Sequence, residues 1–261
     1  MSAVILDSDI LHYEVLGRGR PILFLHGWAG SWRYWIPTMQ AVSINFRTYA
    51  LDFWGFGDSS KNAKYSISDQ VKLIDEFMME LGMMKLALVG HGLGAVVAIQ
   101  FALKFPNMVD RVMAIANPLS SQGVKSRLKS AESVELVDWL LGSGSGTEVV
   151  RADAPKNDPM AVQLSLDDLE RINLNEAWQQ LKTNCLLVHG QNDPAITPPS
   201  LAEFGELPEH MHAVTLENSG HFPMLDESSR FNRLLADFLT LGSGESPRQL
   251  QLKDEWKRRV R

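Results

Sequence analysis

The chain has 261 residues, 45% of them hydrophobic and 21% charged, which is enough for one large α/β domain that carries an insertion. This ordinary globular composition excludes a collagen-like, disordered or coiled-coil protein. The 25 basic and 31 acidic residues give a net charge of −6, so nucleic acid, which binds basic surfaces, is not an expected partner.

Short apolar runs alternate with amphipathic segments of helical length along most of the chain. Residues 4–6 and 11–16 predict two antiparallel strands at the start of the fold. Further strands are predicted at 22–25, 48–51, 86–89, 112–116, 185–188 and 213–216, and helices at 67–81, 93–105, 174–181 and 230–241. Strands separated by helices indicate an α/β fold with a mostly parallel central sheet that has helices on both faces. In such sheets the functional groups lie beyond the carboxyl ends of the strands.

Residues 118–173 interrupt this alternation. They contain a helical run at 124–141 and then a loop rich in Gly, Ser and Pro at 142–159, and the second half of 118–173 is expected to be mobile. We therefore expect a helical lid at 118–173, inserted into a core made of residues 1–117 and 174–241.

The two ends of the chain differ in composition. Residues 242–261 begin with a Gly-Ser-Gly spacer and contain six basic and three acidic residues, which predicts a solvated terminal helix or, as the alternative, a surface for an acidic partner. The N-terminal segment has no basic region and reaches Asp7 and Asp9 too early for a signal peptide.

No apolar run approaches the roughly 18 residues of a membrane-spanning helix. The single cysteine, Cys185, cannot form an internal disulfide. We expect a cytoplasmic protein without a transmembrane segment.

The segment GHGLG at 90–94 joins the strand predicted at 86–89 to the helix that follows it. A strand, a tight turn flanked by small residues and a helix make up the geometry of a nucleophile elbow, because the turn brings the two backbones almost into contact. The N-terminus of the helix also directs main-chain N–H groups toward whatever lies on the turn. This placement makes the turn a candidate active site.

Four further segments occur in a characteristic order. They are HGW at 26–28, DFWGFGDS at 52–59, HGQNDPAITP at 189–198 and SGHFPMLDE at 219–227. Together with the turn, they make the chain resemble the α/β-hydrolase family over residues 10–241. The resemblance implies the α/β-hydrolase fold, with His221 as the catalytic base and Asp193 as the acid that orients it. It also implies an oxyanion hole formed by the main-chain N–H groups of Trp28 and Leu93.

The chain departs from this family at the centre of the turn, where Gly92 stands at the nucleophile position. Family hydrolases carry Ser, or sometimes Asp or Cys, at this position, and glycine offers no side chain to attack a carbonyl carbon. Loss of a catalytic serine lowers turnover by about 10⁶, so acyl-enzyme hydrolysis is expected to be weak or absent. Glycine also avoids most of the strain, about 1–3 kcal/mol, that such a turn imposes on other residues.

Three functions agree with these observations. The first is a hydrolase-fold protein that resembles a small-molecule esterase or C–C bond hydrolase and keeps the His221–Asp193 dyad and the oxyanion hole within a degenerate triad. The second is a non-catalytic protein that binds a small ligand or a partner. The third is an active serine hydrolase that a Ser-to-Gly change at Gly92 has inactivated.

The remaining candidates line a pocket or have structural roles. Aromatic residues on the candidate loops and in or beside the lid predict a pocket for a small apolar substrate or ligand, namely Trp54, Trp139, Trp178 and Phe222. Asn117 and Asp58 are alternative positions for the acid, and His91 has a minor claim to a direct chemical role. His26 and His189 are expected to be structural hydrogen-bonding residues. The sequence contains no metal-ligand set and no phosphate-binding motif, so no cofactor is expected.

Overall fold

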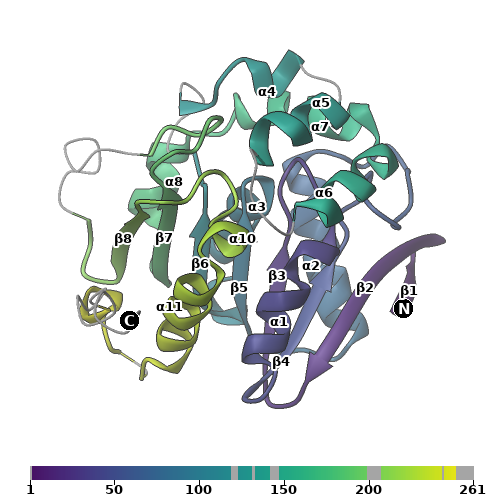
Figure 1. The fold of residues 1–261 in the computed structure, drawn as a ribbon. Coiled ribbons are helices and arrows are strands. Elements are labelled where there is room, and N and C mark those ends of the chain that lie inside the picture. Colours follow the sequence, from purple (N-terminus) through teal and green to yellow (C-terminus); the bar gives the residue numbers. More distant parts are fainter. Residues whose placement is uncertain are drawn as a thin grey trace.

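The computed structural model describes residues 2–118, 123–130, 133–141, 147–198, 207–242 and 244–250. In this part of the chain, eight strands form one sheet in the order β1-β2-β4-β3-β5-β6-β7-β8 (Figure 1). β1 pairs with β2 and β2 with β4 in antiparallel fashion, whereas all other neighbouring strands are parallel. The mostly parallel α/β sheet predicted from the sequence is therefore confirmed.

Every predicted strand is present, with ends that differ by a few residues from the prediction. The strands are β1 (Ser2–Leu6), β2 (Asp9–Gly17), β3 (Arg20–Leu25), β4 (Phe46–Leu51), β5 (Leu86–His91), β6 (Val109–Ile115), β7 (Asn184–Gly190) and β8 (Met211–Leu216). The central strands were recognisable because a parallel strand covered on both faces is apolar along its whole length. All six residues of β5, for example, are buried.

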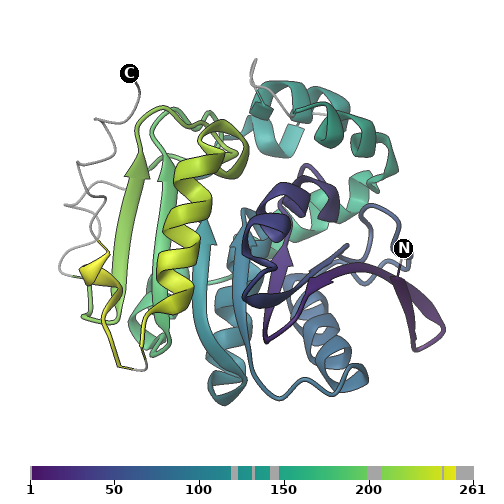
Figure 2. The same ribbon diagram turned by 60° about the horizontal axis from the view of Figure 1, so that its bottom comes forward.

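Helices cover both faces of the sheet (Figure 2). On one face, α1 (Ile36–Val42) packs against α11 (Ser228–Thr240). On the other face, α2 (Ile67–Glu80) and α8 (Leu174–Gln180) pack against α3 (Leu93–Lys104). All of these helices except α1 were predicted. The short α1 and the 3₁₀ turn before it lack a long enough amphipathic repeat to be recognised from the sequence.

A helical insertion, defined here as residues 118–173, lies between β6 and the strand β7. Its described helices are α4 (Arg127–Ser130), α5 (Ser133–Leu141), α6 (Glu148–Asp153) and α7 (Pro159–Leu169). The helical run predicted at 124–141 is confirmed for residues 127–130 and 133–141, while residues 131 and 132 lie outside the described residues. Its start is wrong, because Val124 forms an isolated antiparallel bridge with Ile196 and the first helix begins only at residue 127.

The loop predicted at 142–159 is also wrong from residue 148 onward, where α6 begins, while residues 142–146 lie outside the described residues. Helix-start signals outweigh the loop-like composition here. Asp158 caps α7 by accepting a hydrogen bond from the Met160 N–H at 2.9 Å, and Pro159 occupies the first helical position. The described part of this segment is therefore more helical than its Gly, Ser and Pro content predicted.

The helical insertion lies over the carboxyl-terminal edge of the sheet (Figure 1). The main-chain N–H of Asp158 donates to the Gly55 carbonyl at 2.7 Å, and the Gly57 N–H donates to Asn157 Oδ1 at 3.2 Å. The Tyr65 hydroxyl donates to the Asp158 carboxylate at 2.7 Å. These contacts fix the insertion to the loop that follows β4 (Phe46–Leu51).

The described part of the tail contains only a short 3₁₀ turn, Pro247–Gln249. The terminal helix predicted within 242–261 lies mostly outside the described residues, which end at residue 250. Among the described residues, no helix has both the length and the apolar character needed to cross a membrane.

Candidate active site

β5 and α3 meet at Gly92, whose φ of 52° and ψ of −111° are rarely adopted by residues that carry a side chain. The Gly92 N–H donates to the Ile115 carbonyl at 2.9 Å, which ties the turn to β6. A Cβ at Gly90 would collide with the main chain of Gly94, and a Cβ at Gly94 would collide with the Leu25 carbonyl. The predicted strand, tight turn and helix are therefore present, and the close approach of the backbones explains the flanking glycines.

His221 and Asp193 come together from two loops at the carboxyl edge of the sheet. His221, which follows β8, places Nδ1 2.8 Å from Oδ2 of Asp193, which follows β7. The other carboxylate oxygen accepts the N–H groups of Ala195 and Ile196 at 2.8 and 3.0 Å. Burial by itself raises the pKa of the Asp193 carboxyl, but the charge and hydrogen bond of His221 and the two main-chain donors outweigh burial and hold this pKa below its usual value. Asp193 is thus an ionised partner for the imidazole at neutral pH.

His91, the residue before Gly92, links the turn to the main chain of His221. Because a carbonyl can only accept, His91 Nε2 donates to the His221 carbonyl at 2.8 Å, and Nδ1 accepts from the Tyr34 hydroxyl at 3.0 Å. The same hydroxyl accepts the Gly27 N–H at 2.8 Å. The rings of His91 and His221 have centroids 4.6 Å apart, so the His221 imidazole lies close to the turn. Tyr34 was missed in the sequence because it lies in the unpredicted 3₁₀ turn.

The free energy of unfolding is expected to fall as the pH is lowered below about 6.5. Burial lowers the pKa of His26, His91 and His189, and the neighbouring His221 lowers the pKa of His91 further. In the unfolded chain these histidines bind protons near pH 6.5, whereas in the folded protein they bind protons only at lower pH. Below pH 6.5 the unfolded state therefore binds more protons and is favoured, by up to about 1.4 kcal/mol per pH unit for each neutral histidine.

Denaturant unfolding followed by circular dichroism at pH 7.5, 6.5 and 5.5 tests this expectation. The window stays above the range in which Asp193 titrates, because the pKa of that carboxyl is lowered from 3.8. An unfolding free energy that is the same at pH 7.5 and 5.5 would contradict the neutral, buried state of these histidines.

Trp28 lies in the loop after β3, against the turn at Gly92. Its side chain is buried, and its indole N–H donates to the Ser165 hydroxyl of α7 at 3.0 Å. A Cβ built at Gly92 would stand 3.2 and 3.3 Å from Cε3 and Cζ3 of the indole ring. Leu93 begins α3 directly after the turn. The structure therefore places Trp28 and Leu93, the residues expected to supply oxyanion-hole donors, on two sides of Gly92.

The other predicted aromatic residues are divided between the site and its surroundings. The Phe222 ring is buried, and its centroid lies 5.2 Å from that of His221. Trp54 is buried in the loop after β4, Trp139 lies on α5 and Trp178 on α8. The described contacts bring Phe222 to the dyad. The main-chain N–H and carbonyl of Trp54 bind the Gln70 amide, Arg127 lies over the Trp139 ring, and Trp178 is partly buried against the core.

His26 and His189 bind main-chain groups, as expected for structural residues. His26 Nε2 accepts the Phe53 N–H at 3.0 Å, and His189 Nε2 donates to the Asn117 carbonyl at 3.0 Å. The side-chain amide of Asn117 donates to the carbonyl of its own neighbour, Pro118, at 2.7 Å. Asn117, one of the two alternative positions for the acid, is therefore a neutral amide that binds its own neighbour.

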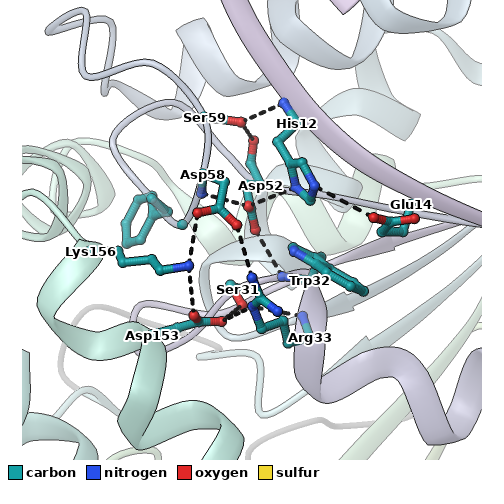
Figure 3. Close-up of polar contacts among 12 residues, drawn as sticks. His12, Glu14, Ser31, Trp32, Arg33, Asp52, Asp58, Ser59, Asp153 and Lys156 are labelled. Carbon is teal, nitrogen blue, oxygen red and sulfur yellow. Dashed lines mark hydrogen bonds and ion pairs between the residues drawn. The ribbon is translucent and has the colours of Figure 1, made fainter. Parts of the chain in front are cut away.

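Asp52 and Asp58 belong to a polar cluster at the loop after β4 (Figure 3). Asp52 Oδ2 accepts the Asp58 N–H at 2.9 Å and lies 3.1 Å from His12 Nδ1. Asp58 pairs with Arg33 at 3.1 Å and with Lys156 at 2.8 Å. His12, Asp52 and Asp58 offer possible metal-ligand atoms within 4.8 Å of one another, but these groups already bind protein donors. The described contacts of Asp58 therefore lead to positive side chains rather than to the dyad.

Known proteins similar to this chain are hydrolases. The family model for the alpha/beta hydrolase fold matches residues 20–141. The chain is 24% identical over 254 residues to the pimeloyl-(acyl-carrier protein) methyl ester esterase of Vibrio cholerae, which covers 88% of this chain and 98% of the relative. The protein of the same name from Vibrio atlanticus is 24% identical over 259 residues, with 88% and 98% coverage.

Solved structures share the fold over nearly the whole chain. The enol-lactonase from Burkholderia xenovorans LB400 has a TM-score of 0.79 at 20% identity and covers 92% of this chain and 100% of its own. A meta-cleavage product hydrolase from Pseudomonas fluorescens IP01 has a TM-score of 0.78 at 23% identity, with 92% and 97% coverage. Sheet order, motif order and these likenesses agree, and the chain has the α/β-hydrolase fold.

Proposed function

We propose that this protein is a hydrolase of the α/β-hydrolase family, similar to small-molecule esterases and C–C bond hydrolases. It keeps the base and the oxyanion hole but lacks the attacking side chain. The observation that carries the proposal is the His221–Asp193 pair beside a turn centred on Gly92. The esterases to which the chain is similar support chemistry at an acyl carbon. Because Gly92 has no side chain to attack the substrate, hydrolysis through an acyl-enzyme is weak or absent.

The remaining groups support direct attack by water. Since ionised Asp193 can only accept, the His221 Nδ1 carries a proton and Nε2 is left as a proton acceptor. His221 removes a proton from water as the water oxygen bonds to the carbonyl carbon, and the carbonyl oxygen takes up the negative charge. The N–H groups of Trp28 and Leu93 bind this oxyanion. The proton then passes from His221 to the leaving group as the bond to that group breaks.

This reduced set of groups is expected to give only slow turnover. In a serine hydrolase without its nucleophile, the oxyanion hole and substrate binding still accelerate the reaction by roughly 10³–10⁴ over water. The helical insertion acts as the lid of the site. The apolar rings of Trp28 and Phe222 favour a small apolar substrate.

Hydrolysis of p-nitrophenyl acetate by the unaltered protein tests the proposal. We expect slow release of p-nitrophenol without an initial burst, and no labelling by a fluorophosphonate, because no side chain forms an acyl-enzyme. His221→Ala should lower the rate by at least about tenfold, since general-base catalysis contributes roughly 10²–10⁴. His212→Ala, which changes a histidine on β8, is the matched control and should keep the rate of the unaltered protein.

Two outcomes would contradict the proposal. A burst with stoichiometric labelling would show that another residue replaces the missing nucleophile. A rate that His221→Ala leaves unchanged would show that the dyad does no chemistry, and it would favour the second function, in which the site binds a small ligand without turnover.

A further inference from the structure

The helical insertion contacts the residues around the expected oxyanion donor at two separate places. The first contact is at Trp28, whose indole N–H donates to the Ser165 hydroxyl at 3.0 Å. Ser165 in turn donates to the Val162 carbonyl at 2.9 Å, one turn earlier on α7. Trp28 and Ser165 are both buried, so this hydrogen bond fixes the direction of the indole ring from the side of the insertion.

The second contact is at Asp153, at the end of α6 (Figure 3). Its carboxylate, only 3% exposed, accepts a hydrogen bond from the Ser31 hydroxyl and lies 3.1 Å from Arg33 Nε and 3.2 Å from Lys156 Nζ. Burying a carboxylate costs free energy unless the group is paired and hydrogen-bonded. Removing the charge of Asp153 would therefore weaken its contacts with Ser31 and Arg33 of the 28–33 segment. Residues 28–33 are thus held by the insertion at each end.

The core holds the residues just before this segment, but by different contacts. The His26 carbonyl accepts the Gly94 N–H at 3.0 Å, and the Gly27 N–H donates to the Tyr34 hydroxyl at 2.8 Å. From residue 28 onward, the insertion binds Trp28, Ser31 and Arg33, as described above. The core loop after β4 also reaches this segment, because Asp52 accepts the Trp32 N–H at 2.9 Å and Asp58 pairs with Arg33. The Trp28 N–H, which is the expected donor, lies where the two sets of contacts meet.

We propose that Ser165 and Asp153 are positioning residues, through which the insertion holds the 28–33 segment and thereby sets the Trp28 main-chain donor and ring against the turn at Gly92. The oxyanion hole is complete only when the insertion is docked. The proposal rests on the proposed function for the role of the donor. The placement of the segment, however, can be measured without any activity.

Amide hydrogen exchange in the unaltered ¹⁵N-labelled protein, read by NMR, gives this measurement. Ser165→Ala and Asp153→Asn are expected to speed exchange at residues 28–33 by about tenfold or more, since local opening controls exchange there. Ser165→Ala should also shift the Trp28 indole N–H resonance, which a Trp28→Phe spectrum identifies. Ser165→Thr, which keeps a hydroxyl, should restore both readouts, and amides of β5 should stay unchanged in every variant.

Two further carboxylates of the insertion provide matched controls. Asp167 accepts from Gln163 on the same helix, α7, and Asp138 pairs with Arg151 inside the insertion. Asp167→Asn and Asp138→Asn change the charge of the insertion without touching the 28–33 segment. Unchanged exchange in this segment is expected for both. Equal acceleration in the control variants and in Asp153→Asn would overturn the proposal, because it would reduce Asp153 to a general stabiliser of the insertion.

An activity measurement in the Gly92→Ser background completes the test. Ser165→Ala and Asp153→Asn are expected to lower kcat for p-nitrophenyl acetate by about tenfold to a hundredfold, because an oxyanion-hole donor is worth roughly 10²–10³ in kcat. KM should change little. If the Gly92→Ser protein is inactive, the proposed function fails while the exchange data still decide this inference. Unchanged exchange with Ser165→Ala overturns the inference whatever the activity.

Discussion

Gly92→Ser is expected to raise kcat/KM for p-nitrophenyl esters by about 10³-fold or more over the unaltered protein. The change supplies a hydroxyl to a turn beside the His221–Asp193 pair, and loss of a catalytic serine costs up to about 10⁶ in turnover where it has been measured. A burst of p-nitrophenol equal to the enzyme concentration and labelling by a fluorophosphonate should accompany the gain. Pre-steady-state kinetics on a panel of acyl chain lengths measures both.

The same change is expected to lower the free energy of unfolding by about 1–2 kcal/mol. A residue with a side chain is strained at a φ of 52°, and its Cβ would stand 3.2 Å from the Trp28 ring, which must shift. Gly92→Ala is the matched control, since it brings the same strain without a hydroxyl. It should lose similar stability and gain no activity.

Two results would contradict these expectations. A folded Gly92→Ser protein without burst activity would show that the remaining groups cannot support acyl transfer. Unchanged unfolding free energies for Gly92→Ser and Gly92→Ala would show that the turn does not have the strained geometry described here.

In the Gly92→Ser background, Asp193→Asn is expected to lower kcat by about 10⁴-fold, and His221→Ala by up to about 10⁶-fold. The Asp193 carboxylate accepts the His221 Nδ1 proton and so leaves Nε2 free to take the hydroxyl proton. An asparagine can instead donate to Nδ1, which gives the wrong tautomer. Steady-state kinetics on the ester that the Gly92→Ser protein hydrolyses fastest provides the measurement.

Asp58→Asn is the control for the acid, because Asp58 was the other carboxylate considered for this role. Its described partners are Arg33 and Lys156, so its loss should change kcat by less than about tenfold. If Asp58→Asn lowers kcat as much as Asp193→Asn does, the assignment of Asp193 as the acid is wrong.

The sheet and most of the core helices could be predicted because their signals are local. Buried parallel strands such as β5 are continuous apolar runs, and α11 alternates apolar and polar faces with helical spacing. The insertion was harder to predict, because short helices such as α4 and α6 gain their stability from packing rather than from a long amphipathic repeat. Composition at 142–159 suggested a loop, whereas the cap at Asp158 begins a helix.

In the candidate site, too, some residues have local sequence signals and others are brought in only by folding. His221, Asp193 and Gly92 were identified from motifs, since each lies in a short segment with a recognisable order of residues. Tyr34 has no such motif around it, and its role depends on where a short 3₁₀ turn brings its hydroxyl. Ser165 is an unremarkable serine in the sequence, and only folding brings it to the Trp28 indole, 137 positions away.

The sequence by itself determined the candidate groups for chemistry: a histidine and an aspartate in segments that resemble hydrolase motifs, and a glycine at the position expected for a nucleophile. Local motifs reveal such facts because they depend on residue identity and spacing. Tertiary structure alone decided that the imidazole lies beside the glycine turn, that the indole of Trp28 packs against the glycine, and that α6 and α7 contact residues 28–33. These contacts join residues far apart in the chain, and their geometry follows from how the sheet and its insertion pack together.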